Sequence, residues 1–153
     1  MPTVTARTCL VWDLDGTLLL AGRPDPVPGL ADVLTAWADR GIPMAVATSA
    51  PTAAARRAVA DVGWTARFSH VAGTGPGVVG KDEVVVEALL GLGLTLPDDA
   101  AGVAVVGDSP ADVAAARTLG LEAVGVGWGR SSAAELLDAG ASWVAHRPAQ
   151  LRP

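Results

Sequence analysis

The strongest constraint on the fold is an alternation of short apolar runs with longer stretches rich in alanine and leucine. The short runs are apolar along their whole length, which is typical of strands that are buried on both faces. The longer stretches have apolar residues at helical spacing and are followed by glycines, which favour helix ends. Buried strands separated by helices predict a doubly wound α/β fold, a parallel sheet between two helical layers.

The spacing predicts six strands, Thr8–Leu14, Pro43–Thr48, Phe68–Ala72, Gly102–Gly107, Glu122–Val126 and Ser142–Ala145. It predicts five helices, Gly29–Arg40, Thr52–Val62, Lys81–Leu92, Pro110–Leu119 and Ser132–Ala139. A chain of 153 residues has the usual size of one domain, so we expect a single domain over residues 1–153.

Composition excludes several classes of protein. The net charge of −5 argues against a nucleic-acid partner, because phosphate backbones are bound by clustered Lys and Arg. The single cysteine, Cys9, forms neither an internal disulfide nor a cysteine-rich zinc site. The apolar runs are far shorter than the roughly 18 residues of a spanning helix, and no signal peptide is visible. We therefore expect a cytoplasmic protein with no membrane partner.

Polar side chains gather where the expected strands end. They are Asp13, Asp15, Thr48, Ser49, Lys81, Asp108 and Asp112. In parallel sheets, ligands bind outside the carboxyl ends of the strands. We therefore expect these side chains to meet on one rim of the sheet.

Several of these residues also have a purely structural interpretation. Asp15-Gly16 is a common turn dipeptide, although two acids at the end of an apolar strand repel each other unless a cation or proton lies between them. Thr48 is also compatible with a helix cap. Ser109 and Asp112 fit a capping box, which does not exclude a second role for Asp112 near a metal.

Lys81 is informative because it begins a helix. A cation there lies at the positive end of the helix dipole, which is mildly unfavourable. A bound phosphate would reverse that effect, whereas Asp82 and Glu83 offset it only in part.

Taken together, Asp13-Leu14-Asp15-Gly16-Thr17-Leu18, then Thr48, then Lys81, then Gly107-Asp108-Ser109 with Asp112 resemble the four motifs of the haloacid dehalogenase (HAD) superfamily of phosphohydrolases. The similarity runs from about Thr8 to Leu151. The later segment Gly125–Gly129 is similar to the phosphoglycolate-phosphatase-like branch. The resemblance implies a Rossmann-like core and a phosphatase.

The resemblance also implies roles for individual residues. Asp13 matches the nucleophile that forms an aspartyl-phosphate, and Asp15 matches the general acid and base. Mg²⁺ would be held by Asp13, the backbone carbonyl of Asp15, and Asp108. The transferring phosphate would be bound by Gly16, Thr17, Thr48, Ser49 and Lys81. Asp112 matches the accessory acidic position of the fourth motif.

One departure from the family pattern concerns substrate selection. The superfamily inserts cap domains between Asp13 and Thr48 or between Thr48 and Lys81, and both intervals are already filled by core elements. Only residues 19–28 remain, as a short flap. We therefore expect a capless enzyme whose open site admits a phosphorylated small molecule or a protruding macromolecular phosphate, or whose lid comes from a second copy of the chain in a homo-oligomer.

Other functions remain as alternatives. Gly75–Lys81 matches a phosphate-binding P-loop, except that Asp82 follows where Ser or Thr would bind Mg²⁺. A phospho-accepting receiver domain has its single phosphorylated Asp before the Thr and Lys, whereas Asp108 comes after both. A non-catalytic scaffold is the third alternative, and the complete set of acids disfavours it.

Overall fold

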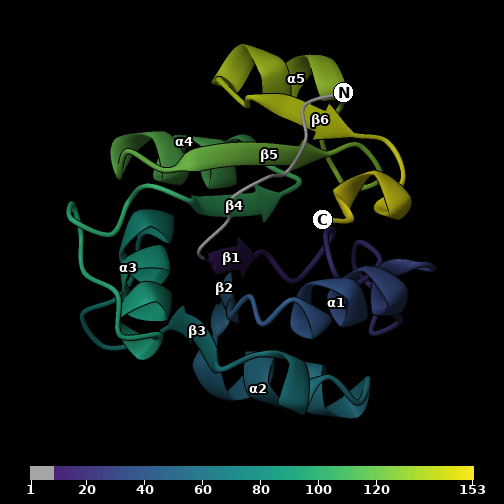
Figure 1. Ribbon diagram of the computed structural model, residues 1–153, viewed down its shortest axis with the longest axis horizontal. Coiled ribbons are helices and arrows are strands. Elements are labelled where there is room, and N and C mark those ends of the chain that lie inside the picture. Colours follow the sequence, from purple (N-terminus) through teal and green to yellow (C-terminus); the bar gives the residue numbers. More distant parts are fainter. Residues whose placement is uncertain (1–8) are drawn as a thin grey trace.

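The strands of the protein form one sheet in which every pair is parallel. The computed structural model describes residues 9–153, so Thr8, the first residue of an expected strand, lies outside the described part. Six strands follow the order β3-β2-β1-β4-β5-β6 (Figure 1). Their bounds are β1 Cys9–Trp12, β2 Met44–Pro51, β3 His70–Thr74, β4 Val103–Gly107, β5 Glu122–Val126 and β6 Trp143–Ala145.

The helices lie between consecutive strands. Five α-helices are present in residues 9–153, namely α1 Leu30–Asp39, α2 Thr52–Asp61, α3 Lys81–Gly91, α4 Pro110–Thr118 and α5 Ala133–Ala139. Two short 3₁₀ segments, Thr65–Arg67 and Pro148–Leu151, complete the set. This arrangement confirms the predicted doubly wound α/β fold.

Three predicted strands differ from the observed ones by two or more residues at an end. The second strand, predicted to end at Thr48, extends to Pro51. The third strand lies two residues later than expected, because Phe68 is buried in the core before the strand starts and β2 extends to Pro51, which pairs with Thr74. The first strand ends at Trp12 rather than Leu14, because Asp13 and the following residues turn out of the sheet.

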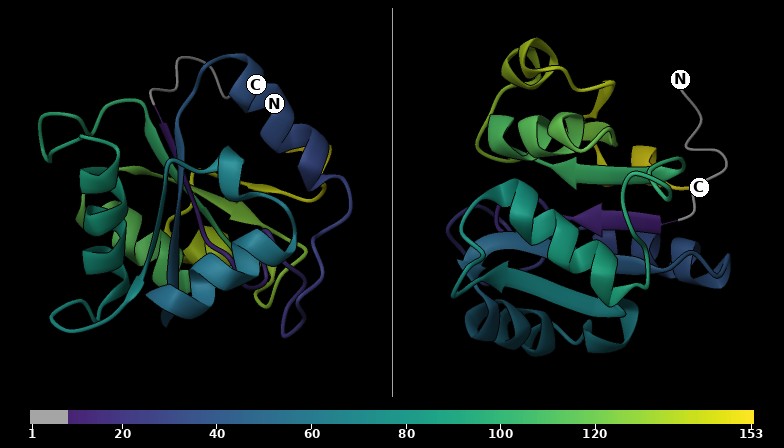
Figure 2. Two further views of the ribbon diagram at one scale, coloured as in Figure 1. Left: turned by 90° about the horizontal axis from the view of Figure 1, so that it is seen from below. Right: turned by 90° about the vertical axis from the view of Figure 1, so that its left-hand side faces the viewer.

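Two separate apolar layers hold the sheet between its helices. Along β1, Leu10 and Trp12 pack on the face covered by α1 and α2, whereas Cys9 and Val11 pack on the face covered by α3, α4 and α5. Figure 1 shows the strands stacked from β3 to β6, with α3 and α4 on one side and α1 on the other, and Figure 2 shows the same layers from two further directions. All four residues of β1 are buried, which explains its uninterrupted apolar sequence.

The chain reverses its direction of progress across the sheet between β1 and β4. β2 and β3 extend to one side of β1, and β4, β5 and β6 extend to the other. The helices that follow β1 and β4 therefore diverge to opposite faces, and a crevice opens at the carboxyl ends of these two neighbouring strands. The backbone N–H of Asp13 donates a hydrogen bond of 2.8 Å to the carbonyl of Val106 in β4. This bond places Asp13 at the crevice.

No cap domain is present in residues 9–153. The connection from β1 to α1 consists of turns and two isolated bridges, between Asp15 and Leu19 and between Leu19 and Pro26. The connection from β3 to α3 is six residues long. Leu18 and Val27 anchor the first connection in the core, while residues 21–26 are exposed. A search of the described helices found none with the length and apolar character needed to span a membrane.

Candidate active site

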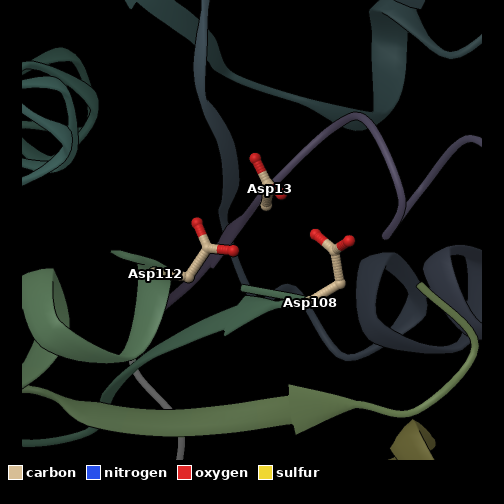
Figure 3. Close-up of side chains that lie close together, drawn as sticks. All are labelled: Asp13, Asp108 and Asp112. Carbon is tan, nitrogen blue, oxygen red and sulfur yellow. The ribbon is translucent and has the colours of Figure 1, made fainter. Parts of the chain in front are cut away.

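Three aspartates meet at the crevice between β1 and β4. Asp13 follows β1, Asp108 follows β4, and Asp112 lies in the first turn of α4. Figure 3 shows the three side chains around one space, and each offers a carboxylate oxygen within 4.8 Å of the other two. All three side chains are buried. The site therefore concentrates negative charge where little water can screen it.

The Lys81 ammonium lies inside this acidic cluster. Lys81 Nζ is 2.8 Å from Asp13 Oδ1 and 2.8 Å from Asp112 Oδ1. It also donates a hydrogen bond of 2.7 Å to the carbonyl of Ala47 in β2. An ammonium has three N–H donors, and these contacts use all of them.

Burial and neighbouring charges shift the pKa values of Asp13 and Lys81. Burial, together with the negative charge of Asp112, raises the pKa of Asp13 well above its ordinary value, although Lys81 opposes the shift. Burial favours the neutral form of Lys81, but Asp112 and Asp13 outweigh it and raise the pKa of Lys81. One ammonium is thus shared by two carboxylates, and the site retains an excess of negative charge.

The residues present fit a hard divalent cation. Three carboxylates around one space supply the oxygen ligands that Mg²⁺ prefers. Burial and the negative charge of Asp112 raise the pKa of Asp13, and a bound cation would favour its ionised form. Asp13, Asp108 and the backbone carbonyl of Asp15 were predicted as metal ligands, and Asp112 as the accessory acid. The structure groups the carboxylates of Asp13, Asp108 and Asp112.

Asp15 lines the same pocket but lies outside the group of three carboxylates. Its carboxylate accepts a hydrogen bond of 2.9 Å from the backbone N–H of Gly22 in the exposed loop after β1. It also pairs with the guanidinium of Arg130. The Asp15 side chain is 42% exposed, compared with 11% for Asp13. The two acids of the first motif therefore have different environments.

Gly16 and Thr17 hold Asp108 in place. Thr17 is buried, and its hydroxyl donates a hydrogen bond of 3.2 Å to Asp108 Oδ1. Gly16 has φ +81°, and a Cβ there would lie 2.1 Å from Asp108 Oδ2. Only glycine satisfies both the left-handed backbone and the close approach. Both residues were predicted to bind phosphate, and the structure brings both of them against Asp108.

The predicted capping box at α4 is confirmed. Asp112 Oδ2 accepts hydrogen bonds from the Ser109 N–H at 3.1 Å and from its hydroxyl at 2.9 Å. The N–H of Asp112 donates in return to the Ser109 hydroxyl oxygen at 3.3 Å. The other carboxylate oxygen of Asp112 contacts Lys81, so this residue both caps the helix and belongs to the site.

The pocket above the cluster has a volume of about 340 Å³. Its lining includes Thr48, whose hydroxyl oxygen accepts a hydrogen bond of 3.2 Å from the backbone N–H of Ala50, and the exposed Ser49. The complete lining is Asp13, Asp15, Thr48, Ser49, Ala50, Lys81, Asp108, Ser109, Asp112 and Arg130. The residues predicted from the strand ends therefore share one pocket.

Arg130 is the charged residue of this pocket that the sequence analysis did not predict. It lies in the loop between β5 and α5, where no periodicity or motif spacing identifies it. The neighbouring segment Gly125–Gly129 was noted only for its similarity to the phosphoglycolate-phosphatase-like branch. The Trp128 indole N–H donates a hydrogen bond of 2.9 Å to the carbonyl of Thr17, so this tryptophan fastens the loop to the first motif.

Comparison with known protein families identifies one that matches most of the chain. The family of haloacid dehalogenase-like hydrolases matches residues 7–120 of the chain. A comparison with curated protein sequences found no match.

Several solved structures have the same fold. A predicted phosphatase from Clostridium acetobutylicum superposes with a TM-score of 0.85 at 18% identity, covering 96% of this chain and 97% of the other. A haloacid dehalogenase-like hydrolase from Streptococcus pneumoniae gives 0.84 at 19% identity with the same coverage. A predicted phosphoglycolate phosphatase from Haemophilus somnus 129pt gives 0.79 at 16% identity, again covering 96% and 97%.

The family match spans well over half of the chain, and both the sheet order and the acids at the ends of β1 and β4 agree with it. The protein therefore belongs to the haloacid dehalogenase-like hydrolase family.

Proposed function

We propose that the protein is a Mg²⁺-dependent phosphomonoester hydrolase that works through an aspartyl-phosphate on Asp13. The observation that carries this proposal is the position of the Asp13 carboxylate in the pocket, beside the Lys81 ammonium and two further carboxylates. A nucleophilic carboxylate that must approach a phosphate dianion requires nearby positive charge. Bound Mg²⁺, held by Asp13, Asp108 and either Asp112 or the backbone carbonyl of Asp15, would reduce the repulsion between Asp13 and the phosphate.

The first step transfers the phosphoryl group to the protein. A carboxylate oxygen of Asp13 forms a bond to phosphorus while the bond from phosphorus to the ester oxygen breaks. Asp15 gives its proton to the departing ester oxygen, so an alcohol leaves. The half-exposed position of Asp15 at the rim suits contact with a leaving group that extends out of the pocket.

The second step releases phosphate. Asp15, now ionised, takes a proton from a water molecule as that water attacks phosphorus, and the bond from phosphorus to the Asp13 oxygen breaks. The products are inorganic phosphate and the original Asp13 carboxylate. Thr48, Ser49 and Lys81 line the pocket around Asp13, which supports a role for them in binding phosphoryl oxygens. Lys81 would exchange one of its carboxylate contacts for a phosphoryl oxygen. Gly16 and Thr17 lie against Asp108, and we propose that they also bind phosphoryl oxygens.

The site is proposed to function within one catalytic domain, residues 1–153, with residues 19–28 as a flap. The flap has a fixed base, because Leu19 is buried and bridges to Pro26. Its exposed residue Gly22 contacts Asp15, which supports a position beside the leaving group. An open site of this kind suits a phosphorylated small molecule or a phosphate that protrudes from a larger one.

Trapping the covalent intermediate tests this proposal. Wild-type protein, Asp13→Asn and Asp15→Asn are mixed with a panel of phosphate esters with or without Mg²⁺, and phosphate release is measured. Each sample is also quenched and reduced with borohydride, which converts an aspartyl-phosphate to homoserine, and position 13 is read by mass spectrometry. Asp138→Asn, which changes an exposed carboxylate of α5, is the matched control.

We expect Asp13→Asn to lose activity by a factor on the order of 10³ or more, with no reduction product at position 13. We expect Asp138→Asn to behave as wild type, and chelation of Mg²⁺ to stop turnover. Full activity in Asp13→Asn would contradict the proposal. A stable phosphate on Asp13 without release would instead favour a phospho-accepting signalling domain.

A further inference from the structure

The loop between β5 and α5 brings a cation to the pocket that the proposed reaction does not use. The Arg130 guanidinium reaches the rim and pairs with Asp15, the proposed acid and base. Its backbone N–H donates a hydrogen bond of 2.9 Å to Asp108 Oδ2, one of the acids of the metal-binding cluster. Arg130 thus contacts both ends of the pocket from a segment outside the four motifs.

The backbone that presents Arg130 is fastened to the site. The Trp128 indole donates to the carbonyl of Thr17 at 2.9 Å. Gly129 packs so tightly that a Cβ there would lie 2.2 Å from Asp108 Cβ. The backbone N–H of Arg130 donates to Asp108. Three consecutive residues, Trp128, Gly129 and Arg130, are therefore each held against the first or fourth motif. The main chain at Arg130 therefore has a defined place, whereas its side chain extends into the pocket opening.

Of the two cations that line the pocket, the Arg130 guanidinium is more available to a ligand than the Lys81 ammonium. Four carboxylates line the pocket, and within residues 9–153 the cations of the lining are Lys81 and Arg130. The three donors of Lys81 are taken by Asp13, Asp112 and the Ala47 carbonyl. The guanidinium has five N–H donors, and its pairing with Asp15 leaves others to bind a ligand.

The present partner of Arg130 is easily exchanged. The Arg130 side chain is 55% exposed and that of Asp15 is 42% exposed, and ion pairs at such positions contribute little to stability. A guanidinium binds carboxylates and phosphates through two parallel hydrogen bonds, so an anionic ligand group satisfies it at least as well as Asp15 does.

We propose that Arg130 is a specificity-determining residue that binds a second anionic group, located on the leaving-group part of the substrate. This rests on the proposed function, because the reaction places the scissile phosphate at Asp13 and the ester oxygen near Asp15. A guanidinium paired with Asp15 then lies on the leaving-group side of the pocket. In the absence of a cap domain, Arg130 supplies a charge that distinguishes one phosphate ester from another.

The test compares esters that differ in one anionic group. 3-Phosphoglycerate and glycerol 3-phosphate share a skeleton and differ by a carboxylate in place of a hydroxymethyl group. Fructose 1,6-bisphosphate and fructose 6-phosphate differ by a second phosphate, so the two pairs distinguish the two kinds of anion. Steady-state kinetics are measured for wild type, Arg130→Gln, Arg130→Lys and Arg57→Gln, an exposed arginine of α2 outside the pocket, as the matched control.

In at least one pair we expect Arg130→Gln to lower kcat/KM about tenfold more for the ester with the additional anionic group than for the ester without it, mainly through KM. Arg130→Lys should restore part of the preference, since it keeps the charge but not the planar fork. Arg57→Gln should behave as wild type. Equal losses on the esters with and without the additional anionic group, or no change on either, would overturn the proposal while the phosphatase function stands.

A binding measurement separates the two proposals if turnover is absent. Should the wild-type protein hydrolyse no ester, the proposed function fails. Calorimetric titration of the four esters into Asp13→Asn, with and without Arg130→Gln, then decides the role of Arg130. The role is supported if the ester with the additional anionic group binds more tightly than its partner and Arg130→Gln removes this difference. It is overturned if Arg130→Gln leaves binding of all four esters unchanged.

Discussion

Lys81 Nζ lies 2.8 Å from Asp13 Oδ1, although the two residues are 68 positions apart in the chain. The contact joins the first residue of α3 to the first residue after β1, across the intervening strand β2. It is possible because the carboxyl ends of these parallel strands, and the helix that starts beside them, face one crevice. The ammonium compensates part of the negative charge at the centre of the site.

Removing that ammonium should destabilise the protein. Lys81→Met leaves Asp13 and Asp112 buried without their cation, and we expect a loss of about 3 kcal/mol in the free energy of unfolding near pH 7.5. Lys81 opposes the rise of the Asp13 pKa, so without it the pKa of Asp13 would lie further above that of the unfolded chain. The stability contribution of this carboxyl is then present at low pH and is lost as pH rises. The deficit should therefore shrink at pH 5, as measured by urea denaturation. If Lys81→Met with Asp112→Asn is no more stable than Lys81→Met alone, the charge explanation is wrong.

Magnesium binding should depend on pH. The raised pKa of Asp13 means that a proton competes with the cation at a higher pH than at an ordinary carboxyl. We expect the apparent Kd for Mg²⁺ to fall as pH rises and binding to release protons. Calorimetry in two buffers of different ionisation enthalpy measures that release. The same heat in both buffers would show that no proton is exchanged.

Asp112 should contribute to cation affinity separately from its role in capping. Asp112→Asn keeps a side-chain oxygen that can accept from Ser109 but removes the charge next to Lys81. We expect Mg²⁺ affinity to fall about tenfold, with only a small change in thermal stability. Ser109→Ala provides the complementary control, since it removes the hydroxyl of the cap and leaves the carboxylate charge. A larger loss of Mg²⁺ affinity in Ser109→Ala would contradict this assignment.

The close packing of Gly129 should be essential to the site. In Gly129→Ala the new methyl would overlap Asp108 and the Gly16 carbonyl, which lies 2.4 Å from the Cβ position. We expect a loss of roughly 1–3 kcal/mol in stability and weaker Mg²⁺ binding. Gly75→Ala is the matched control, because nothing lies within 4 Å of its Cβ position and its φ is not positive. Similar effects in both variants would show that the overlap is not the cause.

Cys9 should be unreactive in the folded protein. Burial raises the pKa of its thiol from 9.0 to about 11, so at pH 8 the thiolate is about 100-fold rarer than for an ordinary cysteine. The side chain is also fully buried in β1. We expect labelling by a disulfide reagent to be slow in native protein and rapid in urea, followed by the absorbance of the released thiolate. Rapid native labelling would indicate that β1 opens readily.

The sequence was sufficient to predict the fold class and most of the pocket. The apolar runs indicate strands buried on both faces, and the residues directly after them become neighbours once the strands are parallel. Asp13, Asp108 and Lys81 could therefore be predicted together. The capping box of Ser109 and Asp112 was also predictable, because it depends on residues three apart in one helical turn.

Only the tertiary structure revealed the pairings that depend on side-chain direction and on loops. Asp15 pairs with Arg130, and the Lys81 ammonium contacts both Asp13 and Asp112. The position of Arg130 depends on where the loop after β5 packs, which no local pattern encodes. Local sequence determines which segments are strands and helices, because periodicity and capping act over a few residues. The partners of a charged side chain are decided by contacts between segments that are distant in the chain, and these exist only after the sheet has formed.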